Sequence, residues 1–79
     1  MTFNFHVRGP TIFDSKIEAP NLESALNMVK GNISEDFHKA GVSVAWAGSP
    51  IWTGANRVST SYRLAPRDEK FYLTIIKAA

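Results

Sequence analysis

Apolar and polar residues alternate at the start of the chain. Within residues 2–8, three apolar side chains fall on one side and four other side chains on the opposite side. This period of two predicts a half-buried β-strand. The dipeptide Gly9-Pro10 interrupts the pattern, because proline lacks the N–H that a strand ladder needs. A weaker alternation resumes over residues 11–18, and two interpretations stay open: one long strand bent by a bulge, or the two strands of a hairpin.

A helical pattern follows the second strand. Asn21 is a good N-cap, since its side chain accepts a hydrogen bond from the first turn, and Gly41 is a natural stop. The apolar residues between them recur at helical spacing. They are Leu22, Leu26, Val29, Ile33 and Phe37. We expect one helix at about residues 21–40, with a kink at Gly31 or a second helix capped by Ser34 as the alternatives, because glycine costs about 1 kcal/mol inside a helix.

Three further alternating segments complete the pattern. Residues 42–47, 57–64 and 70–77 each predict a strand. The last is apolar on both sides, which favours a central position in a sheet or contact with a second subunit. Between the first two, a segment rich in glycine and proline predicts a loop that contains Ile51 and Trp52.

These elements predict a two-layer α+β fold in one domain over residues 1–79. One helix packs on a mostly antiparallel sheet of four to five strands, because short connections favour antiparallel neighbours. The strands are expected at about residues 2–8, 11–18, 42–47, 57–64 and 70–77. A single helix covers one face of such a sheet, so the other face is left open to water or to a partner.

Composition changes this picture in two respects. The chain has 79 residues, no cysteine and 44% hydrophobic residues, so a small core without disulfides must hold it together, and self-association is expected to help. Neither a signal peptide nor an apolar run long enough for a membrane span is visible, so we predict a cytoplasmic protein with no membrane contact. The net charge is +2, and residues 40–79 carry the excess of basic side chains.

Motifs that carry chemistry are missing from the sequence. The five glycines form no phosphate-binding loop. Glu35, Asp36 and His38 lie close together, but charged side chains at a helix end are ordinary surface. To act as nucleophiles, Ser59 and Ser61 would need His6 as a neighbouring base. That requires the first predicted strand to pair with the fourth. We therefore expect no catalytic residue, no metal, no cofactor and no enzymatic activity.

The leading hypothesis is a small interaction protein, expected to form a homodimer, that blocks or recruits a larger protein partner. Trp, Tyr and Arg are the usual hot-spot residues of interfaces. The candidate partner-binding residues are Ile51, Trp52, Arg57, Tyr62 and Arg63. For Trp52 the alternative is that the ring folds back onto the core. Small chains of this profile are often inhibitors of host machinery encoded by phages or mobile elements.

The alternative hypothesis is a nucleic-acid-binding module. Aromatic and basic residues are interleaved over residues 46–63, and such residues stack on bases and neutralise phosphates. The open sheet face would add polar contacts. Its predicted members are Asn4, His6, Arg8, Ser59 and Ser61, together with Arg63.

One short segment resembles known proteins. Residues 17–26, IEAPNLESAL, join a strand end to a capped helix. This junction resembles that of many small bacterial and phage domains, including antitoxins of the HicB type. The resemblance covers about ten residues, reflects general strand-to-helix chemistry, and transfers no functional residue.

Overall fold

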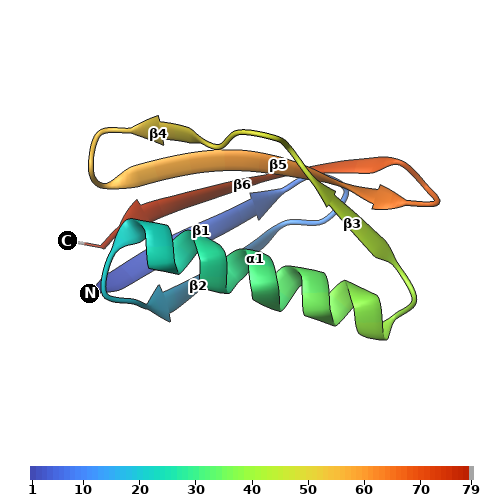
Figure 1. Cartoon of the computed structure of the whole chain (residues 1–79), viewed down its shortest axis with the longest axis horizontal. Helices are drawn as coiled ribbons and strands as arrows, with labels where there is room; N and C mark the ends of the chain where they lie inside the picture. Colours follow the sequence, from blue (N-terminus) through green and yellow to red (C-terminus); the bar gives the residue numbers. More distant parts are fainter. Residues whose placement is uncertain (79) are drawn as a thin grey trace.

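The computed structural model describes residues 1–78 and contains one helix and six strands (Figure 1). The elements are β1 Thr2–Arg8, β2 Phe13–Glu18, α1 Leu22–Lys39, β3 Ser43–Trp46, β4 Ile51–Thr53, β5 Arg57–Ala65 and β6 Glu69–Lys77. The α+β class and the packing of one helix on an antiparallel sheet are confirmed.

All neighbouring strands of the sheet are antiparallel, in the order β2-β1-β6-β5-β3. The short strand β4 also pairs with β5, on the same side as β3. The last strand, β6, is thus central, which is one of the two positions that its two-sided apolar pattern favours.

Two features of the strand prediction change. The sheet has six strands where four to five were expected, because β4 lies in the predicted loop. Its three residues are too few for an alternation to be recognised. The open question about residues 2–18 is also settled, since β1 and β2 form an antiparallel hairpin and Gly9-Pro10 lies in its connection.

The helix runs unbroken through Gly31, so neither the kink nor the second helix is needed. Asn21 caps it as predicted, because its side-chain oxygen accepts a hydrogen bond from the Ser24 amide at 2.8 Å. Gly41 follows the end of α1 with a φ of 76°, a left-handed conformation that glycine adopts without strain.

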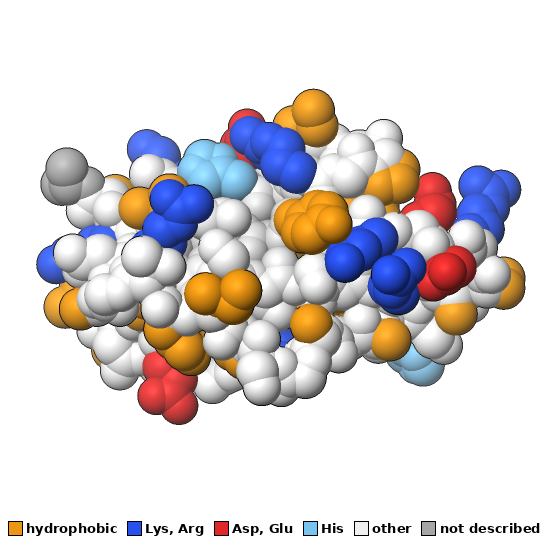
Figure 2. All heavy atoms as spheres, turned by 90° about the horizontal axis from the view of Figure 1, so that it is seen from above, with side chains coloured by type: hydrophobic (Ala, Val, Ile, Leu, Met, Phe, Trp, Pro, Cys, Tyr) orange, Lys and Arg blue, Asp and Glu red, His pale blue; other side chains and the backbone are white. Residues whose placement is uncertain are grey.

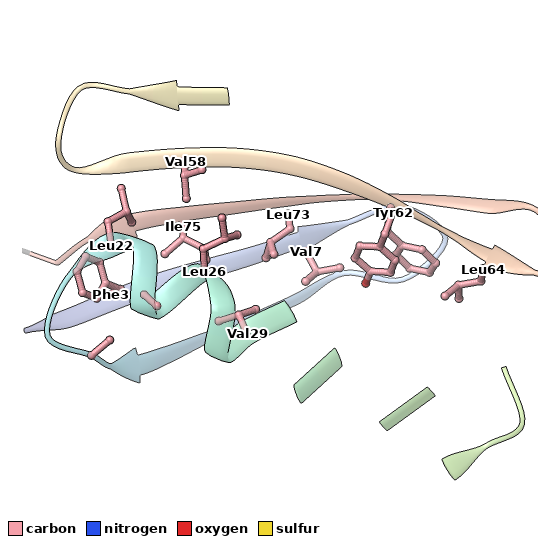
Figure 3. Packing of buried hydrophobic residues seen from close by; sticks show 13 residues of the cluster. Phe3, Val7, Leu22, Leu26, Val29, Val58, Tyr62, Leu64, Leu73 and Ile75 are labelled. Carbon is pink, nitrogen blue, oxygen red and sulfur yellow. The ribbon is translucent and has the colours of Figure 1, made fainter. Parts of the chain in front are cut away.

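The core lies between α1 and one face of the sheet (Figure 3). The strand registers place alternate residues of β1, β5 and β6 on this face, and their side chains point toward the helix. The buried residues that the figure labels are Phe3, Val7, Leu22, Leu26, Val29, Val58, Tyr62, Leu64, Leu73 and Ile75. Only this face of the sheet is covered by a helix.

Gly9 marks a close approach between two strands. A Cβ atom at this position would lie 2.8 Å from the backbone oxygen of Lys70 and 2.9 Å from the ring of Phe71. The backbone oxygen cannot rotate away, so a side chain at position 9 would force the hairpin connection off β6. Gly31 is the opposite case, because a methyl group added there would meet nothing within 4 Å on the exposed side of α1.

The two glycines should therefore respond in opposite directions to alanine. Gly9→Ala should lower the free energy of unfolding by about 1–3 kcal/mol, the usual cost of overpacking. Gly31→Ala should raise it by about 1 kcal/mol, because alanine is the better helix former. Urea unfolding followed by circular dichroism measures both, and equal effects of the two variants would contradict the close approach at Gly9.

Candidate functional site

The open face of the sheet, opposite α1, is the main candidate surface (Figure 2). Among the positions paired between the three central strands, the register places eleven side chains on it. They are Asn4, His6, Arg8, Arg57, Ser59, Ser61, Arg63, Lys70, Tyr72, Thr74 and Ile76. Figure 2 shows basic and hydrophobic side chains separated by other side chains and backbone across this face. It is the surface that we call the open face below.

A hollow of about 250 Å³ lies on the open face where β3 passes into β4. Trp46 pairs with Tyr62 and Ile51 pairs with Ser59, so the four residues 47–50 lie opposite only two residues of β5. The extra residues bulge away from β5 after Ala47, whose amide donates a hydrogen bond to the Ser61 oxygen at 2.9 Å. The bulge creates the hollow.

Large side chains stand on two sides of the hollow and small ones form its floor. Ile51 is 68% exposed and Tyr72 is 53% exposed, and both line the hollow. The register places them diagonally across β5, Ile51 opposite Ser59 and Tyr72 opposite Ser61. Two exposed hydrophobic groups beside a concave surface are a usual feature of a binding site.

Basic groups surround this apolar pair. The Lys70 ammonium lies 5.1 Å from the centre of the Tyr72 ring, within the range of a cation–π contact. Arg63 forms an ion pair with Asp68, with 3.2 Å between Nη1 and Oδ1, and both side chains are largely exposed. Arg57 is exposed at the other end of β5. The hollow is thus flanked by positive charge along the strand direction.

A second polar cluster lies at the β2 side of the open face. The Arg8 guanidinium donates to Asp14 Oδ1 at 2.6 Å, and His6 Nδ1 lies 2.8 Å from the same oxygen. These hydrogen bonds, first that of Arg8 and then that of His6, hold the pKa of Asp14 below its usual value of 3.8. The cluster ties β2 to β1 on the open face.

The predicted partner-binding residues separate into three groups. Ile51, Arg57 and Arg63 lie on the open face. Trp52 points to the other side of β4, opposite Val58 on the helix-facing side of the sheet, and it is 47% exposed. The pair Ile51 and Trp52 therefore forms no single patch, because neighbours in a strand point to opposite faces.

Tyr62 forms the third group, because it belongs to the core. It is 3% exposed and stacks on Phe71 with ring centres 5.1 Å apart. The ring centres of Tyr62 and Trp46 are 4.7 Å apart. Burial raises the pKa of its hydroxyl. Trp46 is also held in place, since its Nε1 donates to Ser34 Oγ at 2.9 Å. These two aromatic rings of the 46–63 segment stabilise the fold and do not lie on the open face.

Tyr72 is an exposed aromatic residue of the open face that sequence reasoning did not select. It lies between Phe71 and Leu73, which are both buried, and it sits on the central strand. The signal was present in the two-sided apolar pattern of residues 70–77. Once β6 is known to be central, the apolar side chains on its second side must lie in the middle of the open face.

The arrangement that a serine nucleophile would require does not form. β1 pairs with β6 and not with β5, so Thr74 lies between His6 and Ser59. Asn4, His6 and Arg8 do share the open face with Ser59 and Ser61, as predicted. Within residues 1–78, no three metal-ligating side chains lie close enough together to hold a metal ion. This holds for Glu35, Asp36 and His38 as well.

Comparisons with known proteins add no further constraint. No family model, no curated protein and no solved structure matches this chain, so its surfaces are interpreted from their own geometry and chemistry. In the described part of the chain, no helix combines the length and the apolar character that crossing a membrane requires.

The Asp14 cluster is expected to make the protein less stable at acidic pH. Because the folded-state pKa of Asp14 is lowered, its stabilising contribution is complete above the unfolded pKa and is lost as the pH falls through the folded value. Between about pH 6 and about pH 3, wild type should lose more unfolding free energy than Asp14→Asn. Urea titrations at one protein concentration measure this, and parallel losses would exclude the cluster as a source of acid sensitivity.

Proposed function

We propose that this protein is a non-enzymatic interaction domain that binds a larger protein through its open face. The observation that carries the proposal is the pair of exposed side chains, Ile51 and Tyr72, beside the hollow on a surface whose other side chains are mostly polar. An apolar side chain of the partner fits this hollow, where it would be shielded from water by both residues. Such binding would block or recruit the partner.

The charges indicate what the rim of the partner surface carries. Arg57 and Lys70 lie around the apolar pair, whereas Arg63 beside them is already paired with Asp68. Carboxylates on the partner would meet these basic groups, which speeds encounter and selects against positively charged surfaces. The proposed partner is therefore a protein with an apolar anchor residue surrounded by acidic side chains.

Nucleic acid is the second candidate, favoured by the basic and polar residues of the open face, among them Arg8, Arg57 and Arg63. Two contacts make it the weaker one. Lys70 already covers a face of the Tyr72 ring, so a base could stack there only by displacing the ammonium. Arg8 and Arg63 are paired with Asp14 and Asp68, which reduces the positive charge available to phosphates.

Replacement of Tyr72 tests the protein-binding proposal. Tagged wild type, Tyr72→Ala and Met28→Ala are used to capture partners from the source cell, and the affinity for each captured protein is then measured with purified components. Met28 is the matched control, because it is also an exposed hydrophobic residue but lies on α1. Tyr72→Ala should weaken binding about 30-fold, which corresponds to a hot-spot loss of about 2 kcal/mol, whereas Met28→Ala should leave it unchanged.

Two results would overturn the proposal. The first is an affinity that Tyr72→Ala and Met28→Ala alter equally, which would move the interface away from the open face. The second is salt-sensitive binding of labelled DNA or RNA that is weakened by Arg57→Ala, because phosphate contacts are steeply salt-dependent. That second result would establish the nucleic-acid candidate in its place.

A further inference from the structure

Strand β2 ends the sheet on one side and leaves its outer edge unpaired within the described chain. The Ala19 amide donates to the Met1 oxygen at 3.0 Å, in register with the β1–β2 pairs. Hydrogen-bonded pairs alternate along an antiparallel ladder, so Phe13, Ser15 and Ile17 bond to β1. The backbone groups of Asp14, Lys16 and Glu18 consequently point outward, free to pair with another strand.

The opposite edge of the sheet is less suited to pairing. It consists of β3 and β4, which are four and three residues long and are separated by the bulge at residues 47–50. Pro50 in the bulge has no N–H to donate. Figure 1 shows β3 crossing at an angle to the run of β4. A long, regular and unpaired edge is therefore present only at β2 within the described residues.

We propose that β2 pairs antiparallel with β2 of a second copy of this chain, with Ser15 at the two-fold axis. The two sheets then form one continuous sheet with both helices on the same side. This dimer interface is separate from the hollow and from Tyr72, so it does not depend on the proposed partner binding. It would also join the two open faces into a single surface.

Charge selects this register over its neighbours. With Ser15 opposite Ser15, Asp14 of each copy lies opposite Lys16 of the other, and opposite charges directly across a strand pair are stabilising. A shift of the register in one direction places the two Asp14 side chains opposite each other. A shift in the other direction places the two Lys16 side chains opposite each other. Lys16 has no ion-pair partner among residues 1–78, so its charge is available for this contact. Asp14 already accepts from Arg8, and its carboxylate would accept from Lys16 of the second copy in addition.

Apolar contacts favour the same register. Phe13 is 56% exposed, although it packs against Phe5 with ring centres 5.9 Å apart. In the proposed pairing Phe13 lies opposite Ile17 of the second copy, on the helix-facing side of the sheet. These two positions would form a non-hydrogen-bonded pair, in which opposing side chains approach most closely. The contact occurs twice in the dimer and covers apolar surface that one copy leaves in water.

Single cysteines test both the dimer and its register. The chain contains no cysteine, so Ser15→Cys introduces its only thiol. Directly opposite Cβ atoms in a non-hydrogen-bonded pair are close enough for a disulfide. Under mild oxidation Ser15→Cys should become a covalent dimer at least tenfold faster than Lys16→Cys, because the two residues at position 16 would be diagonal neighbours about 7–8 Å apart. Non-reducing electrophoresis over time measures the two rates.

Light scattering on the untagged wild type provides the second measurement. It should give twice the chain mass at about 100 μM, and Lys16→Pro should weaken the dimer at least tenfold relative to Lys16→Val. Proline at position 16 removes an outward N–H, whereas valine keeps it. A monomeric wild type, equal oxidation rates of the two cysteine variants, or equal dimerisation of the proline and valine variants would each overturn the proposal.

Discussion

The packing of α1 on one face of the sheet is the contact on which the rest of this structure depends. It buries Leu22, Leu26 and Val29 against β1, β5 and β6, and no disulfide supports it. Because the chain of 79 residues forms one helix beside a six-stranded sheet, the second face remains in water. The division into a helix-covered face and an open face then decides the position of every candidate functional residue.

The irregular edge of the sheet has a consequence for the open face. A regular strand beside β5 would present a flat surface, but the two additional residues between β3 and β4 bend the edge outward and leave the hollow. The same irregularity weakens this edge as a template for another strand. One bulge thus supports both proposals, because it provides a concave site on the face and leaves β2 as the edge that can pair.

Much of the fold could be predicted from the chain itself. Asn21, Gly41 and the apolar stripe of α1 set the limits of the helix, and tertiary packing outweighed the helix-breaking tendency of Gly31. The strands over 2–8, 57–64 and 70–77 follow from clear alternation. β4 could not be predicted, because three residues pair only when the neighbouring β5 provides a template. The same holds for the close approach at Gly9, which depends on the backbone of Lys70.

The candidate site could be predicted only in part, and Tyr62 and Tyr72 show the reason. Each tyrosine lies in an alternating strand, and the sequence by itself determined which residues share a side with it. In residues 57–64 every side chain opposite Tyr62 is polar, so the pattern alone indicates that Tyr62 is buried. In residues 70–77 both sides carry apolar residues, and a period of two then distinguishes two faces without naming the buried one. Only the tertiary structure decided that Tyr72 belongs to the open face. Strand register decided it, because Tyr72 pairs with Arg8 of β1 and Ser61 of β5, which lie on the face of the sheet away from α1.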